Sequence, residues 1–143
     1  MLRREVVVKE LQKPRVEEIL ERILEIFEEN FPTPEDEQLY AVETLNVPAL
    51  SEMTVIWIVE RGWIGYLKKL YADAVPETTY EWRIPFRDIV FRGNEIPFYK
   101  PLRIPELAEV ILKITNESIE TQDIDILIVG WARKIRGRGV ETW

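Results

Sequence analysis

The feature that most constrains the fold is a change in the spacing of apolar residues across Pro32 and Pro34. Upstream, apolar side chains recur every three or four residues, the period of an α-helix, at Val16, Ile19, Leu20, Ile23, Leu24 and Phe27. Downstream, apolar and polar residues alternate, which is the period of a β-strand. Two prolines so close together end a helix and interrupt strand pairing. The sequence therefore predicts an amphipathic helix, a linker and then a β domain.

Short β-like segments separated by turn signals fill the chain after the linker. The segments are 39–45, 54–59, 62–72, 79–84, 87–91, 109–115 and 123–133, and the turn signals lie at 46–48, 74–76, 92–94, 97–105 and 116–118. This spacing is typical of an antiparallel sandwich or barrel. We expect a mainly β fold in which the N-terminal amphipathic helix precedes an antiparallel β-sandwich. The expected parts are a helical segment 1–31, a linker 32–38, a β domain 39–134 and a basic tail 135–143.

Alternation within two of these segments indicates which side chains face the core. They are Tyr80, Trp82 and Ile84 in one segment and Ile124, Ile126 and Ile128 in the other. The opposite face of the last segment carries Leu127, Val129 and Trp131, where a solvated face carries polar residues, so we expect another element to cover it. Segment 54–59 is apolar on both faces, which predicts a strand at the centre of a sheet covered on both sides.

The helix needs a partner for its apolar stripe, because an isolated helix of this length is marginal in water. Two alternatives remain open: the stripe packs on its own domain, or it packs on the same helix of a neighbouring subunit. The resulting interface candidates are Ile19, Leu20, Ile23, Phe27, Leu127, Val129 and Trp131.

The chain has no cysteine and no histidine, which excludes large classes of chemistry. Disulfides, Cys/His zinc sites, and nucleophiles paired with an imidazole are impossible. Carboxylates remain, but no spacing among the 26 acidic residues singles out a catalytic pair. Asp123 and Asp125 share a strand face without any calcium-loop spacing around them. We therefore expect a non-enzymatic protein without a metal or other cofactor.

Charge is distributed unevenly along the chain. Residues 1–38 and 39–131 each carry a net charge of −5, whereas residues 132–143 carry +3, which gives −7 in total. An acidic body repels phosphate backbones, so nucleic-acid binding is expected only through the basic tail, if at all. No apolar stretch is long enough for a membrane span, and the start does not resemble a signal peptide. We expect a cytoplasmic or virion protein, and the few Asn, Gln and Met residues are typical of a thermophile.

Aromatic residues offer a second kind of site. Five Trp and five Tyr occur, and a sandwich with a row of exposed aromatic rings can stack on sugars. The candidates are Trp63 and Tyr66, beside two glycines, and Tyr99 in a proline-punctuated segment. Core packing and contacts between subunits are the alternatives for these side chains.

Segments after residue 53 resemble small β-sandwich proteins of tailed phages and proviruses. The stretches that carry the resemblance are 60–67, 79–84, 96–105, 110–116 and 128–131. The resemblance covers 54–131 and rests on the order and spacing of strand and turn residues. It implies a single jelly-roll-like sandwich that acts as a virion or particle component and assembles as a symmetric oligomer, with other particle proteins as partners and the helix as a docking element.

The expected function is thus that of a structural or interaction protein that self-assembles into a homo-oligomer. The alternative is a carbohydrate-binding module that uses Trp63, Tyr66 and Tyr99.

Overall fold

The computed structural model describes residues 3–5, 16–39 and 41–135, and the chain divides into two compact units, Met1–Phe31 and Pro32–Trp143. The first unit contains the predicted helix, α1 (Val16–Asn30). Glu17 and Glu18 in its first turn interact favourably with the helix dipole. At the other end, the Asn30 side chain donates a hydrogen bond to the carbonyl oxygen of Ile26. Among the described residues, no helix is both long and apolar enough to cross a membrane.

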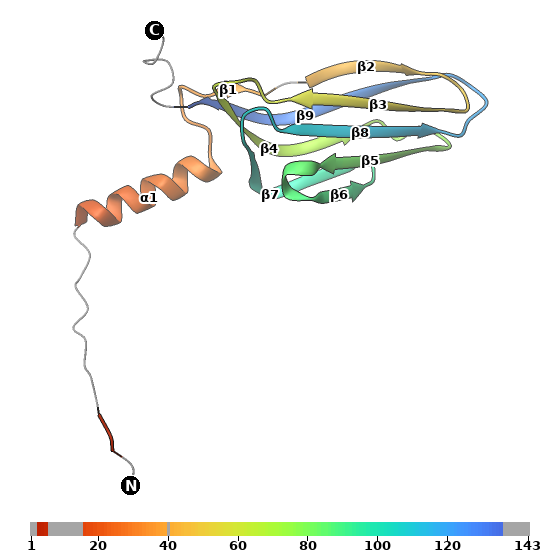
Figure 1. Ribbon diagram of the computed structural model, residues 1–143. Helices are drawn as coiled ribbons and strands as arrows, with labels where there is room; N and C mark the ends of the chain where they lie inside the picture. The colour runs from red at the N-terminus through yellow and green to blue at the C-terminus, as the bar shows by residue number, and fades with distance from the viewer. Residues whose placement is uncertain (1–2, 6–15, 40, 136–143) are drawn as a thin grey trace. The chain divides into compact units, whose positions relative to one another are not determined.

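The second unit is a sandwich of two antiparallel sheets, as the sequence predicts (Figure 1). Its elements are β1 (Glu37–Gln38), β2 (Ala41–Val47), β3 (Ser51–Ile58), β4 (Trp63–Ala72), β5 (Thr78–Ile84), the short 3₁₀ helix η1 (Pro85–Arg87), β6 (Ile89–Arg92), β7 (Glu95–Ile104), β8 (Glu109–Asn116) and β9 (Gln122–Lys134).

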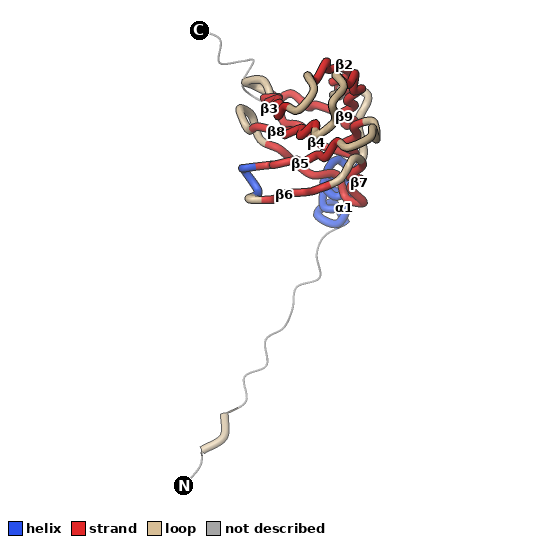
Figure 2. The backbone as a smooth tube through the Cα atoms, turned by 90° about the vertical axis from the view of Figure 1, so that its right-hand side faces the viewer, coloured by secondary structure: helices blue, strands red, loops and turns tan. Residues whose placement is uncertain are grey.

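The first sheet has the order β2-β9-β4-β7, and β1 pairs with the far end of β9, beyond the part that pairs with β2. The second sheet has the order β3-β8-β5-β6. Figure 2 shows the two sheets as two layers. The chain crosses repeatedly from one sheet to the other, and this strand order is that of a jelly roll. The predicted fold class is therefore confirmed.

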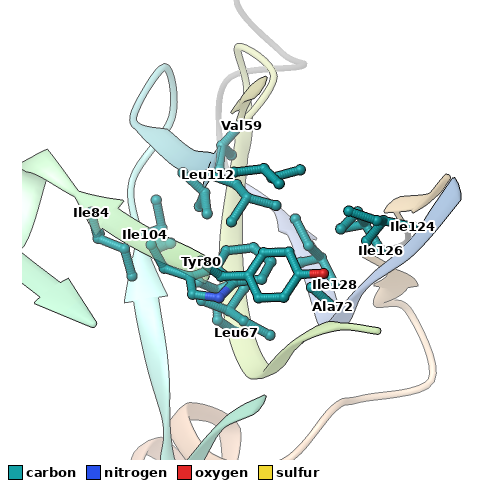
Figure 3. Close-up of a cluster of buried hydrophobic side chains, with 14 of the residues drawn as sticks. Val59, Leu67, Ala72, Tyr80, Ile84, Ile104, Leu112, Ile124, Ile126 and Ile128 are labelled. Atoms are coloured by element: carbon teal, nitrogen blue, oxygen red, sulfur yellow. The ribbon is translucent and has the colours of Figure 1, made fainter. Parts of the chain in front are cut away.

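The hydrophobic core lies between the two sheets (Figure 3). Every side chain that alternation placed in the core is buried: Tyr80, Trp82, Ile84, Ile124, Ile126 and Ile128. Figure 3 shows Leu67 and Ile104 of the first sheet in the same cluster as Leu112 of the second. The period-2 pattern thus identified the buried faces of β5 and β9 correctly.

Three local expectations were wrong. Segment 97–105 was expected to be a turn, but it belongs to β7. Pro97 and Pro101 are tolerated because β7 is an edge strand, so one side of it needs no hydrogen-bonding partner. The predicted linker contains β1, because the prolines block pairing only at their own positions. Segment 54–59 was expected at the centre of a sheet, but β3 is an edge strand with Ile56 and Ile58 exposed on its outer face.

Candidate functional site

A pocket opens between the two sheets at the end of the sandwich where β3 leads into β4. Its volume is about 300 Å³, at the lower limit for small-molecule sites. Four core residues, Leu67, Ile104, Val110 and Ile128, are almost fully buried and form part of its lining. The indole rings of Trp57 and Trp63 line it as well, one from each sheet. The pocket therefore has an apolar and aromatic interior.

Charged groups surround this aromatic pocket. The exposed side chains of Glu37 and Glu60 belong to its lining. Trp63 lies opposite Lys134 in the pairing of β4 with β9, and the Lys134 Nζ is 5.8 Å from the centroid of a Trp63 ring. This is a cation–π distance. The entrance thus combines two carboxylates with an aromatic ring that already attracts a cation.

Tyr66, the second predicted stacking residue, lies on the opposite face of β4 from Trp63. Its ring stacks on Trp131 with the centroids 5.4 Å apart, and the two residues are only 5% and 7% exposed. The guanidinium of Arg133 lies 5.0 Å from the centroid of the Tyr66 ring. A ring buried in this way has no free face for a sugar.

Asp36 connects the linker to the cluster that Tyr66, Trp131 and Arg133 form. Its carboxylate accepts two hydrogen bonds from Arg133, at 2.9 Å to Nε and 2.8 Å to Nη2, and a third from the backbone N–H of Thr33 at 2.7 Å. The Asp36 side chain is 1% exposed. Burial alone raises the pKa of Asp36, but the hydrogen bonds from Arg133 and Thr33 outweigh burial and lower that pKa below its usual value.

Tyr99, the third predicted stacking residue, is fully exposed on the edge strand β7. The register of the β4–β7 pairing shifts beside Tyr99. Between the paired residues Pro97 and Leu102, β7 has four residues where β4 has only Lys68. Trp63, Tyr66 and Tyr99 therefore lie at three separate places, and the structure does not bring them together into one stacking surface.

The predicted interface residues fall into two groups. Ile19, Leu20, Ile23 and Phe27 are all exposed on α1. On the outer face of β9, Leu127 and Val129 are half-buried, whereas Trp131 is buried by its own unit, beside Tyr66. We expected another element to cover this face. At Trp131, residues of the same unit cover it.

Sequence reasoning missed an apolar row on the outer face of the second sheet. Ile56, Ile111, Arg83 and Val90 are cross-strand neighbours on β3, β8, β5 and β6. Ile56 is 51% exposed and Val90 is 46% exposed. Residues of β3 alternate between half-buried and exposed, which indicates an open outer face. The expectation of a central strand led to the opposite prediction.

The acidic residues considered for chemistry have structural partners. Thr44 donates a hydrogen bond to Asp125, and Asn46 donates one to Asp123, across the pairing of β2 with β9. Within the described part of the chain, no group of three or more acidic side chains is arranged to hold a metal ion. The basic tail from residue 136 onwards lies outside the described residues.

No protein-family model matches this chain, and no curated protein matches it. Among solved structures, the chain is similar to the Drosophila NLP core, whose crystal structure addressed pentamer formation and histone binding. The two share 17% sequence identity, and the match covers 65% of this chain and 98% of the NLP core with a TM-score of 0.31. A likeness this weak carries no argument about this chain, and the resemblance to phage proteins stays a prediction.

Proposed function

We propose that this chain is a non-enzymatic protein that self-assembles, with α1 helices from several copies packed together as a short bundle. The observation that carries the proposal is the apolar stripe of α1. Its residues Val16, Ile19, Leu20, Ile23, Leu24 and Phe27, with Ile26 beside them, are all exposed within their own unit. A helix of 15 residues is too short to be stable on its own in water, so this stripe requires a partner.

The spacing of the stripe favours identical helices as that partner. In a heptad that begins at Val16, Val16 and Ile23 occupy position a, and Ile19 and Ile26 occupy position d. Isoleucine at both a and d favours bundles of three or more helices over two-stranded coiled coils. Leu20 and Phe27 widen the stripe further, as expected where each helix contacts two neighbours.

Two heptads alone make a weak bundle, so the β units must add contacts. The outer face of the second sheet supplies a second surface in each copy, where Ile56 and Val90 are exposed, Ile111 is half-buried and Arg83 lies between Ile111 and Val90. Linking two weak surfaces in one chain raises their effective concentration, and the whole assembly is then tighter than either contact alone.

The test is the absolute mass in solution, measured by light scattering on a size-exclusion column at low and high salt. We expect a closed oligomer that persists in high salt. Ile23→Lys puts a charge into the apolar stripe along which the α1 helices pack, and should convert the oligomer to monomers. Glu25→Gln, on the opposite helix face, changes the net charge by the same amount and should leave the mass unchanged. A monomeric wild-type protein, or equal behaviour of the two variants, would overturn the proposal.

The carbohydrate-binding alternative has weaker support, because it needs aromatic rings that share one exposed surface. The virion role rests on the sequence resemblance. Jelly rolls occur in viral capsid proteins and lectins alike, and a fold does not by itself assign a function.

A further inference from the structure

The pocket at the end of the sandwich has the composition of a site for a cation. An aromatic ring attracts a cation placed over its face, and the attraction grows when water is excluded. Trp63 already has the Lys134 ammonium at 5.8 Å from its ring centroid. Because the Lys134 side chain is exposed, it can move into solvent when another cation takes its place. Lys134 itself does not line the pocket, so its ammonium shows that the Trp63 ring attracts a cation next to the pocket, for which a ligand would compete.

The charges at the entrance also favour a cation. Glu37 and Glu60 both line the pocket, and both are exposed. Their carboxylates favour a positively charged ligand and repel an anion. The net charge of −7 on the chain adds to this preference at long range.

The apolar floor limits the kind of cation. Leu67, Ile104 and Ile128 offer no side-chain hydrogen-bond acceptor to a primary ammonium that has lost its water, and an unsatisfied N–H group is costly to bury. A quaternary ammonium has no N–H group and carries its charge on methyl groups, so it fits both the floor and the indole ring. The volume of about 300 Å³ admits only a small molecule.

We propose that this pocket binds a small organic cation with a quaternary ammonium head, which takes the place of Lys134 over Trp63. This ligand site is independent of self-assembly through α1.

The experiment is isothermal titration calorimetry of the full chain with choline and with its neutral isostere 3,3-dimethylbutan-1-ol. We expect choline to bind at least about two- to fivefold more tightly than the isostere, which corresponds to the lower range of cation–π energies. Lys134→Met removes the internal competitor and should tighten choline binding by about two- to fivefold without changing binding of the isostere. Glu60→Gln should weaken choline binding only.

Two further variants test the location of the site. Trp63→Leu keeps an apolar wall and should abolish the preference for choline. Tyr99→Ala removes an exposed ring elsewhere on the unit and should leave binding unchanged. Equal affinity for the two probes, absence of choline binding, or choline binding that neither Lys134→Met nor Trp63→Leu alters would overturn the proposal.

Discussion

At the scale of single residues, Gly130 occupies a position that no other residue can fill. It faces Leu67 in β4, beside the point where Lys68 interrupts the pairing of β4 with β9. A Cβ at residue 130 would lie 1.9 Å from the backbone oxygen of Tyr66. Because the clash is with backbone, no side chain can move aside to relieve it. An isolated glycine inside a strand pattern is the sequence signal for such a close approach.

We expect Gly130→Ala to lower the free energy of unfolding by about 3 kcal/mol or more, because β4 and β9 must separate locally. Gly65→Ala is the matched control within the same sheet. There the added Cβ would lie 3.3 Å from a side-chain methyl of Val59, so we expect a smaller loss. Urea unfolding followed by far-ultraviolet circular dichroism measures both variants, and equal losses would contradict the assignment.

Asp36 gives the second residue-scale prediction, a dependence of stability on pH. Its pKa is lower in the folded protein than the ordinary value of 3.8. The unfolded chain therefore binds this proton more readily, so the stabilisation from Asp36 is complete above pH 4 and is lost as the pH falls through the folded pKa. We expect Asp36→Asn to lose about 1–3 kcal/mol at neutral pH. The difference in free energy of unfolding between wild type and Asp36→Asn should disappear in strong acid.

Urea unfolding of wild type and Asp36→Asn at a series of pH values measures this gap. Glu35→Gln removes an exposed neighbouring carboxylate and serves as the control. A gap that stays constant from pH 7 down to strong acid would show that the ion pair with Arg133 is not what Asp36 contributes.

At the scale of elements, the edge strands of the sandwich are protected unequally. β7 carries Pro97 and Pro101 and an irregular register, and β6 has only four residues. β3, by contrast, pairs with β8 without interruption from Ser51 to Ile58, and Glu52 is its one charged residue. A long, regular and apolar edge is a template for pairing with another chain.

We therefore expect Ile56→Lys to raise the temperature at which the protein aggregates, because a lysine on an open edge opposes strand addition. In the Ile23→Lys background, which removes assembly, the half-exposed Ile56 side chain contributes little, so the free energy of unfolding should change by less than about 1 kcal/mol. Val90→Lys introduces the same charge at a similarly exposed position on the short strand β6. Light scattering during heating compares the two variants, and an equal effect of both would mean that net charge, not the β3 edge, controls aggregation.

The elements also show what local sequence can and cannot predict. Helical spacing located α1, and alternation identified the buried faces of β5 and β9. The prolines of β7 were read as a turn, because their cost depends on whether a neighbouring strand needs the missing N–H. Only the sheet order supplies that information. The same limit hid the pocket, since its lining joins Trp57 and Trp63 with residues of β7, β8 and β9, which are distant in the sequence.

At the scale of the whole molecule, strand order depends on contacts between residues far apart in the sequence. β2 has β9 as its partner in the first sheet, with Ala41 opposite Ile128. No local pattern specifies such a pair, so the sequence alone predicts a sandwich but not its order. The pocket depends on this strand order as well, because its lining comes from β1, β3, β4, β7, β8 and β9.

The position of β9 also determines the order in which a newly made chain can fold. β9 lies between β2 and β4 in the first sheet, yet it follows the other described strands in the sequence. β5 and β6 can pair as soon as they emerge, whereas β2 and one side of β4 must wait until β9 has been made. Closing such long loops is slow, and unpaired apolar strands are vulnerable while they wait. Synthesis of β9 is therefore the step on which completion of the first sheet depends.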